Sequence, residues 1–180
     1  HALAFALIVG GIVVSSRRCT CPPLAPALAL AHAAPSHRGN IPPMNDDTLT
    51  ALDAHALSDA IHRRDVSCRE VMTAYLVRIA RLNPLHTAIV ALAPEDSLFA
   101  QADACDAELA AGRSRGWLHG QPVAIKDTGQ ATGFATSFGS ALLARQIARE
   151  DSLYVSRMKA AGAIVIGKTN MSEFGLGSHS

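Results

Sequence analysis

The sequence predicts an α/β fold in which helices cover the faces of a sheet. The chain has 180 residues, of which 49% are hydrophobic and 17% are charged, so it can bury the core of about one domain. Segments with helical periodicity alternate with short apolar runs that have the length of buried strands. The predicted order is helix, helix, strand, helix, strand, a loop with a helix, helix and strand.

The balance of charges argues against a nucleic-acid partner. Sixteen Lys and Arg residues stand against fifteen Asp and Glu, which gives a formal net charge of +1. A protein that holds a nucleic-acid backbone needs a basic field, and this composition does not provide one. The two apolar runs near the N-terminus are both shorter than the roughly 20 residues of a spanning helix, so no stable membrane span is expected.

Residues 1–45 are expected to be a secretory signal or a disordered extension, followed by a linker. Arg17 and Arg18 precede an apolar run, and Ala31-His32-Ala33 has the small-x-small pattern of a cleavage site. This pattern predicts export to the periplasm. The alternative is a cytoplasmic chain with an Ala/Pro-rich extension from a misplaced start. The folded domain is expected over residues 46–180.

Two helices are predicted at the start of this domain. Apolar residues at helical spacing predict one helix from Leu49 to Arg64. Ser67 and Glu70 form a capping box, so a second helix should begin near Cys68. Asn83-Pro84 is expected to end that helix, because proline lacks the backbone N–H that a helix interior needs.

The rest of the domain alternates predicted strands and helices. Apolar runs at residues 87–93, 123–125 and 163–166 are expected to be short strands, the first and last of them buried. Asp96 should cap a helix that Gly112 ends. Asp151 should cap another, which Gly162 ends.

The four cysteines do not predict a metal site. Cys19 and Cys21 form a Cys-x-Cys pair without a second ligand pair. Cys68 and Cys105 could form a disulfide after export, but spacing along the chain does not establish that they are within bridging reach. Two buried free thiols are the default expectation.

Residues 162–169 (GAIVIGKT) match the phosphate-loop pattern G-x-x-x-x-G-K-[ST] letter for letter. In a phosphate loop a strand precedes the first glycine, and the four variable residues form the turn that holds phosphate. Here the first glycine closes a predicted helix and the variable residues suit a strand. We therefore reject a nucleotide-binding NTPase.

Lysines are rare, and two of them stand where chemistry is expected. The chain has only Lys126, Lys159 and Lys168. Lys126 and Lys168 follow apolar runs, where an exposed surface lysine is not the first expectation. For Lys168, a structural lysine that bonds loop carbonyls is the favoured interpretation.

Three stretches with specific order and spacing resemble the amidase signature family. The resemblance is clear over residues 116–180, and the helices from residue 47 onward look like the helical layer of that family. The stretches are residues 119–127 (HGQPVAIKD), 136–140 (TSFGS) and 161–174 (AGAIVIGKTNMSEF).

The resemblance implies an α/β domain with a mixed sheet covered by helices, and hydrolysis or transfer at a non-peptide carboxamide of a small-molecule substrate. It implies no metal and no cofactor. Catalysis would use a nucleophilic serine, a second serine held by a cis peptide, and a lysine at the base of the proton relay. Lys126 matches this lysine. Its position after Val-Ala-Ile suggests a desolvated ammonium, which loses its proton more readily; the alternative is a structural pair with Asp127.

The sequence departs from the family in its serines. No Gly-Gly-Ser-Ser-Gly-Gly motif occurs in the 180 residues, so the nucleophile and its oxyanion-binding backbone are not assigned. We therefore expect the N-terminal part of an amidase, truncated and inactive as this chain alone. The alternative is a non-catalytic remnant.

Overall fold

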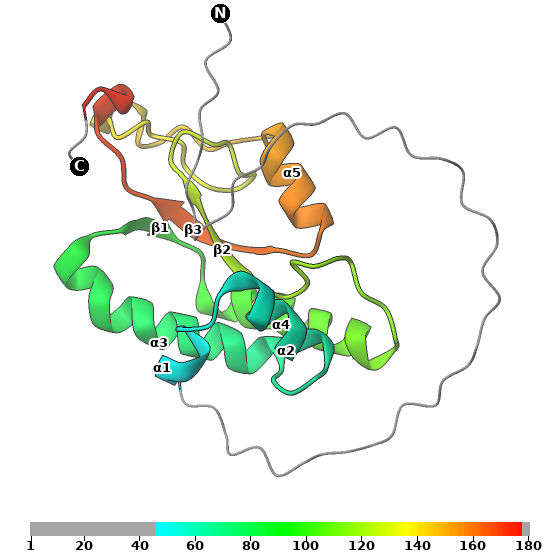
Figure 1. Ribbon diagram of the computed structural model, residues 1–180. Coiled ribbons are helices and arrows are strands. Elements are labelled where there is room, and N and C mark those ends of the chain that lie inside the picture. Colours follow the sequence, from blue (N-terminus) through cyan, green and yellow to red (C-terminus); the bar gives the residue numbers. More distant parts are fainter. Residues whose placement is uncertain (1–45, 178–180) are drawn as a thin grey trace, which may run out of the picture. The chain divides into compact units, whose positions relative to one another are not determined.

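The computed structural model describes residues 46–177 and shows the predicted α/β architecture (Figure 1). The expectations for residues 1–45, among them the signal sequence, lie outside the described residues. The same holds for residues 178–180. The elements are the helices α1 (Asp46–Leu49), α2 (Ala54–His62), α3 (Cys68–His86), α4 (Glu95–Ala110) and α5 (Leu153–Ala160), the strands β1 (Ile89–Leu92), β2 (Pro122–Lys126) and β3 (Ile164–Thr169), and the 3₁₀ turns η1 (Ala141–Leu143) and η2 (Glu173–Gly175).

The three described strands form a mixed sheet in the order β1-β3-β2. β3 lies at its centre, antiparallel to β1 and parallel to β2. Gly167 lets β1 approach closely, since a Cβ there would lie 2.4 Å from the carbonyl oxygen of Ala91. The prediction of a buried strand is right for β3 and wrong for β1. Val90 and Leu92 remain exposed because β1 pairs with only one described neighbour and has one open face.

The helices α1 to α4 lie on one side of the sheet and α5 lies on the other (Figure 1). The sheet separates two apolar clusters. On one face, Ile164 and Ile166 of β3 pack against the layer formed by α1 to α4. On the other face, Val165 packs with Ile125 of β2 and Val155 of α5. Adjacent residues of β3 point to opposite faces, as the two-residue period of a strand requires. This division matters for the site, because it decides on which face each strand-end side chain lies.

The capping box predicted for α3 is confirmed. Ser67 accepts a hydrogen bond from the backbone N–H of Glu70, and the Glu70 carboxylate accepts one from the backbone N–H of Ser67. Asp106 of α4 supplies two further acceptors, for the N–H groups of Cys68 at 2.7 Å and Arg69 at 3.1 Å. The free N–H groups at the start of α3 are therefore satisfied by α3's own cap and by its neighbour.

Three of the predicted helix boundaries are wrong. The single helix expected from Leu49 to Arg64 is two helices, because Asp53 caps a new start by accepting from the N–H of Ala56 at 2.8 Å. α4 begins at Glu95 after Pro94, without a cap from Asp96. α5 begins after Ser152, and Asp151 accepts hydrogen bonds from Thr132 and Lys159 instead of capping the helix.

α3 also continues through Pro84 to His86, although Pro84 was expected to end it. The proline lies in the last turn, where its missing N–H costs the helix a single hydrogen bond near its end. The side chain of Asn83 is occupied elsewhere, because it both donates to and accepts from the backbone of Ile89. The glycine stops were predicted correctly: Gly112 and Gly162 follow α4 and α5 with φ of 71° and 99°.

Candidate functional site

The predicted lysines lie at the ends of two neighbouring parallel strands. Lys126 is the last residue of β2, and Lys168 is the penultimate residue of β3. Parallel strands end at the same edge of a sheet, so both lysines belong to this edge. The register pairs Lys126 with Thr169 and Ile125 with Lys168. Paired residues share a face and successive residues alternate, so Lys126 and Lys168 are assigned to opposite faces.

Lys168 is fully buried, with 0% of its surface exposed. Its ammonium donates three hydrogen bonds, each 3.2 Å long, to a carboxylate oxygen of Asp127, the carbonyl oxygen of Ala135 and the hydroxyl of Thr136. An ammonium has three protons, and each of them has an acceptor here. This confirms the interpretation of Lys168 as a structural lysine that bonds a loop carbonyl, and adds a buried ion pair with Asp127.

Asp127 is the acceptor that organises this edge of the sheet. Its carboxylate accepts from the backbone N–H of Ser137 at 3.1 Å, from the Ser137 hydroxyl, and from the backbone N–H of Gly139 at 3.2 Å. Burial raises the pKa of Asp127, but the hydrogen bonds from Ser137, Gly139 and Lys168 outweigh it and hold the pKa below its ordinary value. The group is therefore a carboxylate at neutral pH.

The loop bound by Asp127 is fixed on its other side as well. Ser140 donates to the Glu173 carboxylate at 2.8 Å, and the N–H of Phe174 donates to the carbonyl of Phe138 at 2.7 Å. Gly139 adopts φ of 70°, and a Cβ there would lie 2.7 Å from the carbonyl oxygen of Met171. Residues 136–140 and 171–174, which belong to two of the stretches that resemble the amidase signature family, thus pack directly against each other.

Lys126 is exposed, contrary to the expectation of a desolvated ammonium. Within residues 46–177 its side chain makes neither a hydrogen bond nor an ion pair. The alternative of a pair with Asp127 is also wrong, because Asp127 pairs with Lys168. The physical reason is the alternation of the strand end: Asp127 and Ile125 face the cluster around Lys168, and Lys126 between them points away.

Sequence reasoning missed Asp127 as an organising residue and the part played by Ser137 and Gly139. A signal was present in the chain. An acidic residue directly after a strand, followed by a Thr-Ser-x-Gly stretch, is a carboxylate followed by hydroxyl and backbone donors. Spacing alone did not identify Lys168 as the cation that completes the cluster, because 41 positions separate it from Asp127.

The stretch that matches a phosphate loop has the conformation expected for a strand. Gly162 follows α5, and Ile164 begins β3 two residues later. The side chains of Ile164, Val165 and Ile166 are buried in the two apolar clusters. The backbone N–H groups of this segment are thus committed to the sheet and do not form a turn around an anion.

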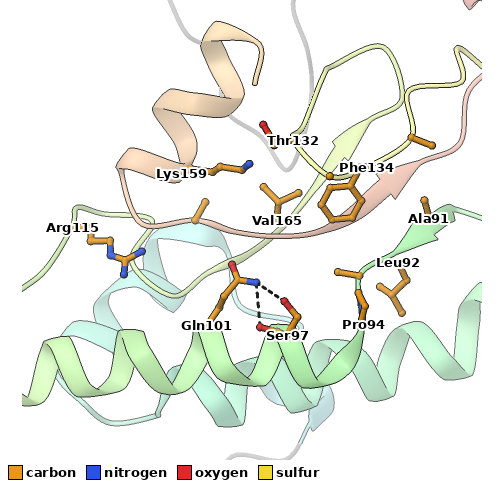
Figure 2. A pocket seen from close by; sticks show the side chains of 14 residues that line it. Ala91, Leu92, Pro94, Ser97, Gln101, Arg115, Thr132, Phe134, Lys159 and Val165 are labelled. Atoms are coloured by element: carbon orange, nitrogen blue, oxygen red, sulfur yellow. Dashed lines mark hydrogen bonds between the residues drawn. The ribbon is translucent and has the colours of Figure 1, made fainter. Parts of the chain in front are cut away.

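A cavity of about 530 Å³ opens between α4, the end of β1, the loop at residues 132–135 and α5 (Figure 2). Arg115 and Lys159 line it, but each is paired, with Glu108 at 2.6 Å and Asp151 at 2.8 Å. Neither Lys126 nor Asp127 contributes to its wall. The cavity therefore gives no support to a substrate site at the strand ends.

Two further properties of residues 46–177 bear on other kinds of site. In this part of the chain, His, Cys, Asp and Glu side chains do not gather into a group of three or more that could hold a metal ion. None of its helices is long and apolar enough to cross a membrane.

The mixed sheet, with helices on both faces, defines an α/β domain of the kind found in amidase-signature enzymes. The solved structure of the native peptide amidase from Stenotrophomonas maltophilia matches it with a TM-score of 0.63 and 36% identity, over 69% of this chain and 26% of that one. Fatty acid amide hydrolase matches with a TM-score of 0.65 and 23% identity, over 70% and 22%, which supports the fold alone.

The chain belongs to the amidase family, whose family model, described as "Amidase", matches residues 70–180. Among curated relatives, the A subunit of glutamyl-tRNA(Gln) amidotransferase from Thiobacillus denitrificans is 45% identical over 130 residues, covering 72% of this chain and 26% of that protein. Its counterpart from Methylobacillus flagellatus is 44% identical over 122 residues, with coverages of 68% and 24%. The chain thus spans about a quarter of the length of the curated relatives it matches.

Proposed function

We propose that this chain is part of an enzyme that cleaves the C–N bond of a non-peptide carboxamide, with Lys126 as the base of a serine-based proton relay. The observation that carries the proposal is the family match over residues 70–180, within which Lys126 is the last residue of the strand β2. Relatives and neighbours carry different names, such as amidotransferase and peptide amidase, so no particular amide is proposed within the class of non-peptide carboxamides.

The buried cluster beside Lys126 supports this role. The carboxylate of the next residue, Asp127, accepts hydrogen bonds from Lys168, Ser137 and Gly139. These bonds hold the backbone in place directly after Lys126. The Lys126 side chain itself is left without a partner among residues 46–177. An unpaired lysine on a rigid strand end is suited to exchange protons with another group, whereas Lys168 has every proton bonded.

In the proposed relay, the nucleophilic serine attacks the amide carbonyl and passes its proton through a second serine to the neutral amine of Lys126. The proton then passes to the amide nitrogen, so that the C–N bond breaks, the amine or ammonia leaves and the acyl group stays on the serine; water then hydrolyses this acyl-enzyme to the carboxylic acid and the free serine. A lysine that is neutral near pH 7 requires desolvation. The proposal therefore includes further protein that covers Lys126, and the serines are expected outside residues 1–180. No metal or cofactor takes part.

The test uses the complete protein and measures ammonia or hydroxamate release from a panel of simple amides. Lys126→Ala should lower kcat by roughly 10⁴-fold or more, the loss typical of removing one member of such a catalytic unit. Lys159→Ala is the matched control. Lys159 lies on α5 and pairs with Asp151, so its substitution is expected to leave kcat unchanged. Chelation with EDTA should also leave kcat unchanged.

A fully active Lys126→Ala would refute the relay assigned here. Amide turnover by residues 1–180 alone would refute the assignment of the serines to another part of the protein. If the complete protein hydrolyses no amide in the panel and no transfer to hydroxylamine occurs, the second hypothesis, a non-catalytic remnant, is favoured.

A further inference from the structure

Cys68 and Cys105 lie against each other in the helical layer. Cys68 is the first residue of α3 and Cys105 belongs to the second half of α4. Both are fully buried, with 0% and 1% of their surface exposed, and both are free thiols. The Cys68 sulfur and the Cys105 Cβ lie 2.2 Å and 3.6 Å from the same point, the position that a Cβ on Gly120 would take. Residues 69–104 separate them along the chain, so the contact is produced by the packing of the two helices.

Polar contacts fix this pair of helices on either side of the thiols. Asp106, next to Cys105, accepts from the backbone N–H groups of Cys68 and Arg69. Arg69 also forms an ion pair with Asp103 at 2.6 Å. The start of α3 is thereby attached to α4 one residue after and two residues before Cys105. These contacts hold the two helix segments that carry the thiols against each other.

Gly120 leaves the space that the sulfur of Cys68 occupies. It is buried, adopts φ of 73°, and a Cβ there would lie 2.2 Å from the sulfur of Cys68 and 3.6 Å from the Cβ of Cys105. Any side chain at this position would force the thiols to move. The pair is thus enclosed by α3, α4 and the loop before β2.

The two thiols are not equivalent. The neighbouring Cys68 thiol lowers the pKa of Cys105, against the effect of burial and with help from Arg115. The neighbouring Cys105, together with burial and the nearby Asp106, raises the pKa of Cys68. Since the thiolate is the nucleophile in thiol–disulfide exchange, Cys105 is the thiol that reacts first.

We propose that Cys68 and Cys105 form a dithiol that closes to an internal disulfide when a small disulfide such as oxidised glutathione is the oxidant. The Cys105 thiolate attacks one sulfur of the oxidant and releases the first glutathione thiolate, which takes up a proton. Cys68 then loses its proton and attacks the Cys105 sulfur of the mixed disulfide, releasing the second glutathione. Two thiols are oxidised and one glutathione disulfide is reduced to two thiols.

The bond would join the start of α3 to α4 around the segment that contains β1. It lies in the helical layer and not at the strand ends, so it is expected to stabilise the layer without altering the lysine site. Because the thiols are buried, oxidation requires a local opening of the first turn of α3 and should be slow. Export, which the pattern of residues 1–45 predicts, would place the pair in an oxidising compartment.

The test incubates the intact folded protein with oxidised glutathione, blocks the remaining thiols under denaturing conditions and maps tryptic peptides without reduction. Trypsin separates all four cysteines into three peptides, residues 19–38, 65–69 and 82–113. The expected product is a peptide 65–69 joined to 82–113, with the loss of two hydrogen atoms, which disappears after treatment with dithiothreitol. Cys68→Ala should stop at a mixed disulfide of glutathione with Cys105.

Two results would overturn the proposal. One is that Cys68 and Cys105 both remain fully alkylatable after an incubation long enough to oxidise the same protein in urea. The other is that the bonds found are between residues 19–38 and either helix. The melting temperature gives an independent readout: it should rise on oxidation in the wild type and should not rise in Cys68→Ala or Cys105→Ala. A wild type that gains the bond without this rise would overturn the stabilising role.

Discussion

Lys126 and Lys168 end two parallel strands with similar sequences, Val-Ala-Ile-Lys and Val-Ile-Gly-Lys, yet their surroundings are opposite. Lys168 has no exposed surface and three acceptors within 3.2 Å. Lys126 is exposed and has no polar partner within residues 46–177. The difference arises from the register, in which Lys168 pairs with Ile125 and not with Lys126. Successive side chains of a strand point to opposite faces of the sheet, so Lys126 lies on the face opposite to Lys168.

This contrast teaches which lysine is available for chemistry. Each proton of the Lys168 ammonium already has an acceptor, and breaking its buried ion pair leaves an uncompensated charge. The Lys126 amine has no acceptor among the described residues, so its hydrogen-bonding positions are open to another group. We therefore assign a structural role to Lys168 and the proposed proton transfer to Lys126. The following experiments test this assignment.

Lys168→Ala should produce the largest loss of stability. Removal of one partner of a buried ion pair costs about 3–5 kcal/mol, because Asp127 stays buried without its cation. Urea unfolding of the intact protein measures the change in the free energy of unfolding. Lys159→Ala is the control: its pair with Asp151 is partly exposed, so we expect a loss of about 1 kcal/mol or less. Equal losses in the two variants would contradict a structural role for Lys168.

Gly139→Ala should cost less, about 2–4 kcal/mol, from a left-handed backbone and a clash with Met171. Gly133→Ala is a matched control, since Gly133 has φ of 86° but nothing within 4 Å of the position that a Cβ would take. Gly133→Ala should lower the free energy of unfolding only through the strain of the left-handed backbone, by about 1–2 kcal/mol. The difference between the two unfolding energies isolates the packing of residues 136–140 on 171–174. If the two losses are equal, that packing contributes nothing measurable.

Local patterns predicted the elements well because their causes are local. The capping box at Ser67 and the glycine stops at Gly112 and Gly162 depend on residues within one helical turn. The environment of a strand-end side chain depends instead on register and on the neighbours of the strand. A run of apolar residues therefore indicated a strand before Lys126 and before Lys168, but it could not show which lysine would be buried.

The cluster around Asp127 also combines local contacts with one contact that depends on strand pairing. Its partners Ser137 and Gly139 lie within 12 positions of it and belong to residues 136–140, a stretch that already stood out by its resemblance to the family. The fourth member, Lys168, comes from the next strand of the sheet, and only the pairing of β2 with β3 brings it near. Long-range pairing of this kind cannot be read from spacing along a single chain.

The Asp127 cluster should make stability depend on acid pH. The folded state holds the pKa of Asp127 below its ordinary value of 3.8, so its carboxylate adds stability above that pH. The contribution is lost as the pH falls from about 3.8 through the lower pKa of the folded state. Melting temperatures of the wild type and Asp127→Asn, compared from about pH 7 to about pH 2, should converge at the acid end. A gap that does not change with pH would show that the charge of Asp127 contributes nothing.

Lys126→Ala should have the smallest effect on stability, about 1 kcal/mol or less, although it abolishes the proposed activity. Lys126 has no carboxylate partner in the described part of the chain, so its removal leaves no buried carboxylate without its cation, as removal of Lys168 does. Urea unfolding and amide turnover are measured on the same preparation, so that loss of activity is separated from loss of fold. If Lys126→Ala unfolds as easily as Lys168→Ala, then Lys126 is bonded in the complete protein as a structural lysine, and the contrast between the two strand ends does not distinguish their roles. Lys126→Arg sharpens the result, because arginine keeps the positive charge but does not release a proton near neutral pH. An inactive and stable Lys126→Arg would therefore assign to Lys126 the transfer of a proton and not only the placement of a charge.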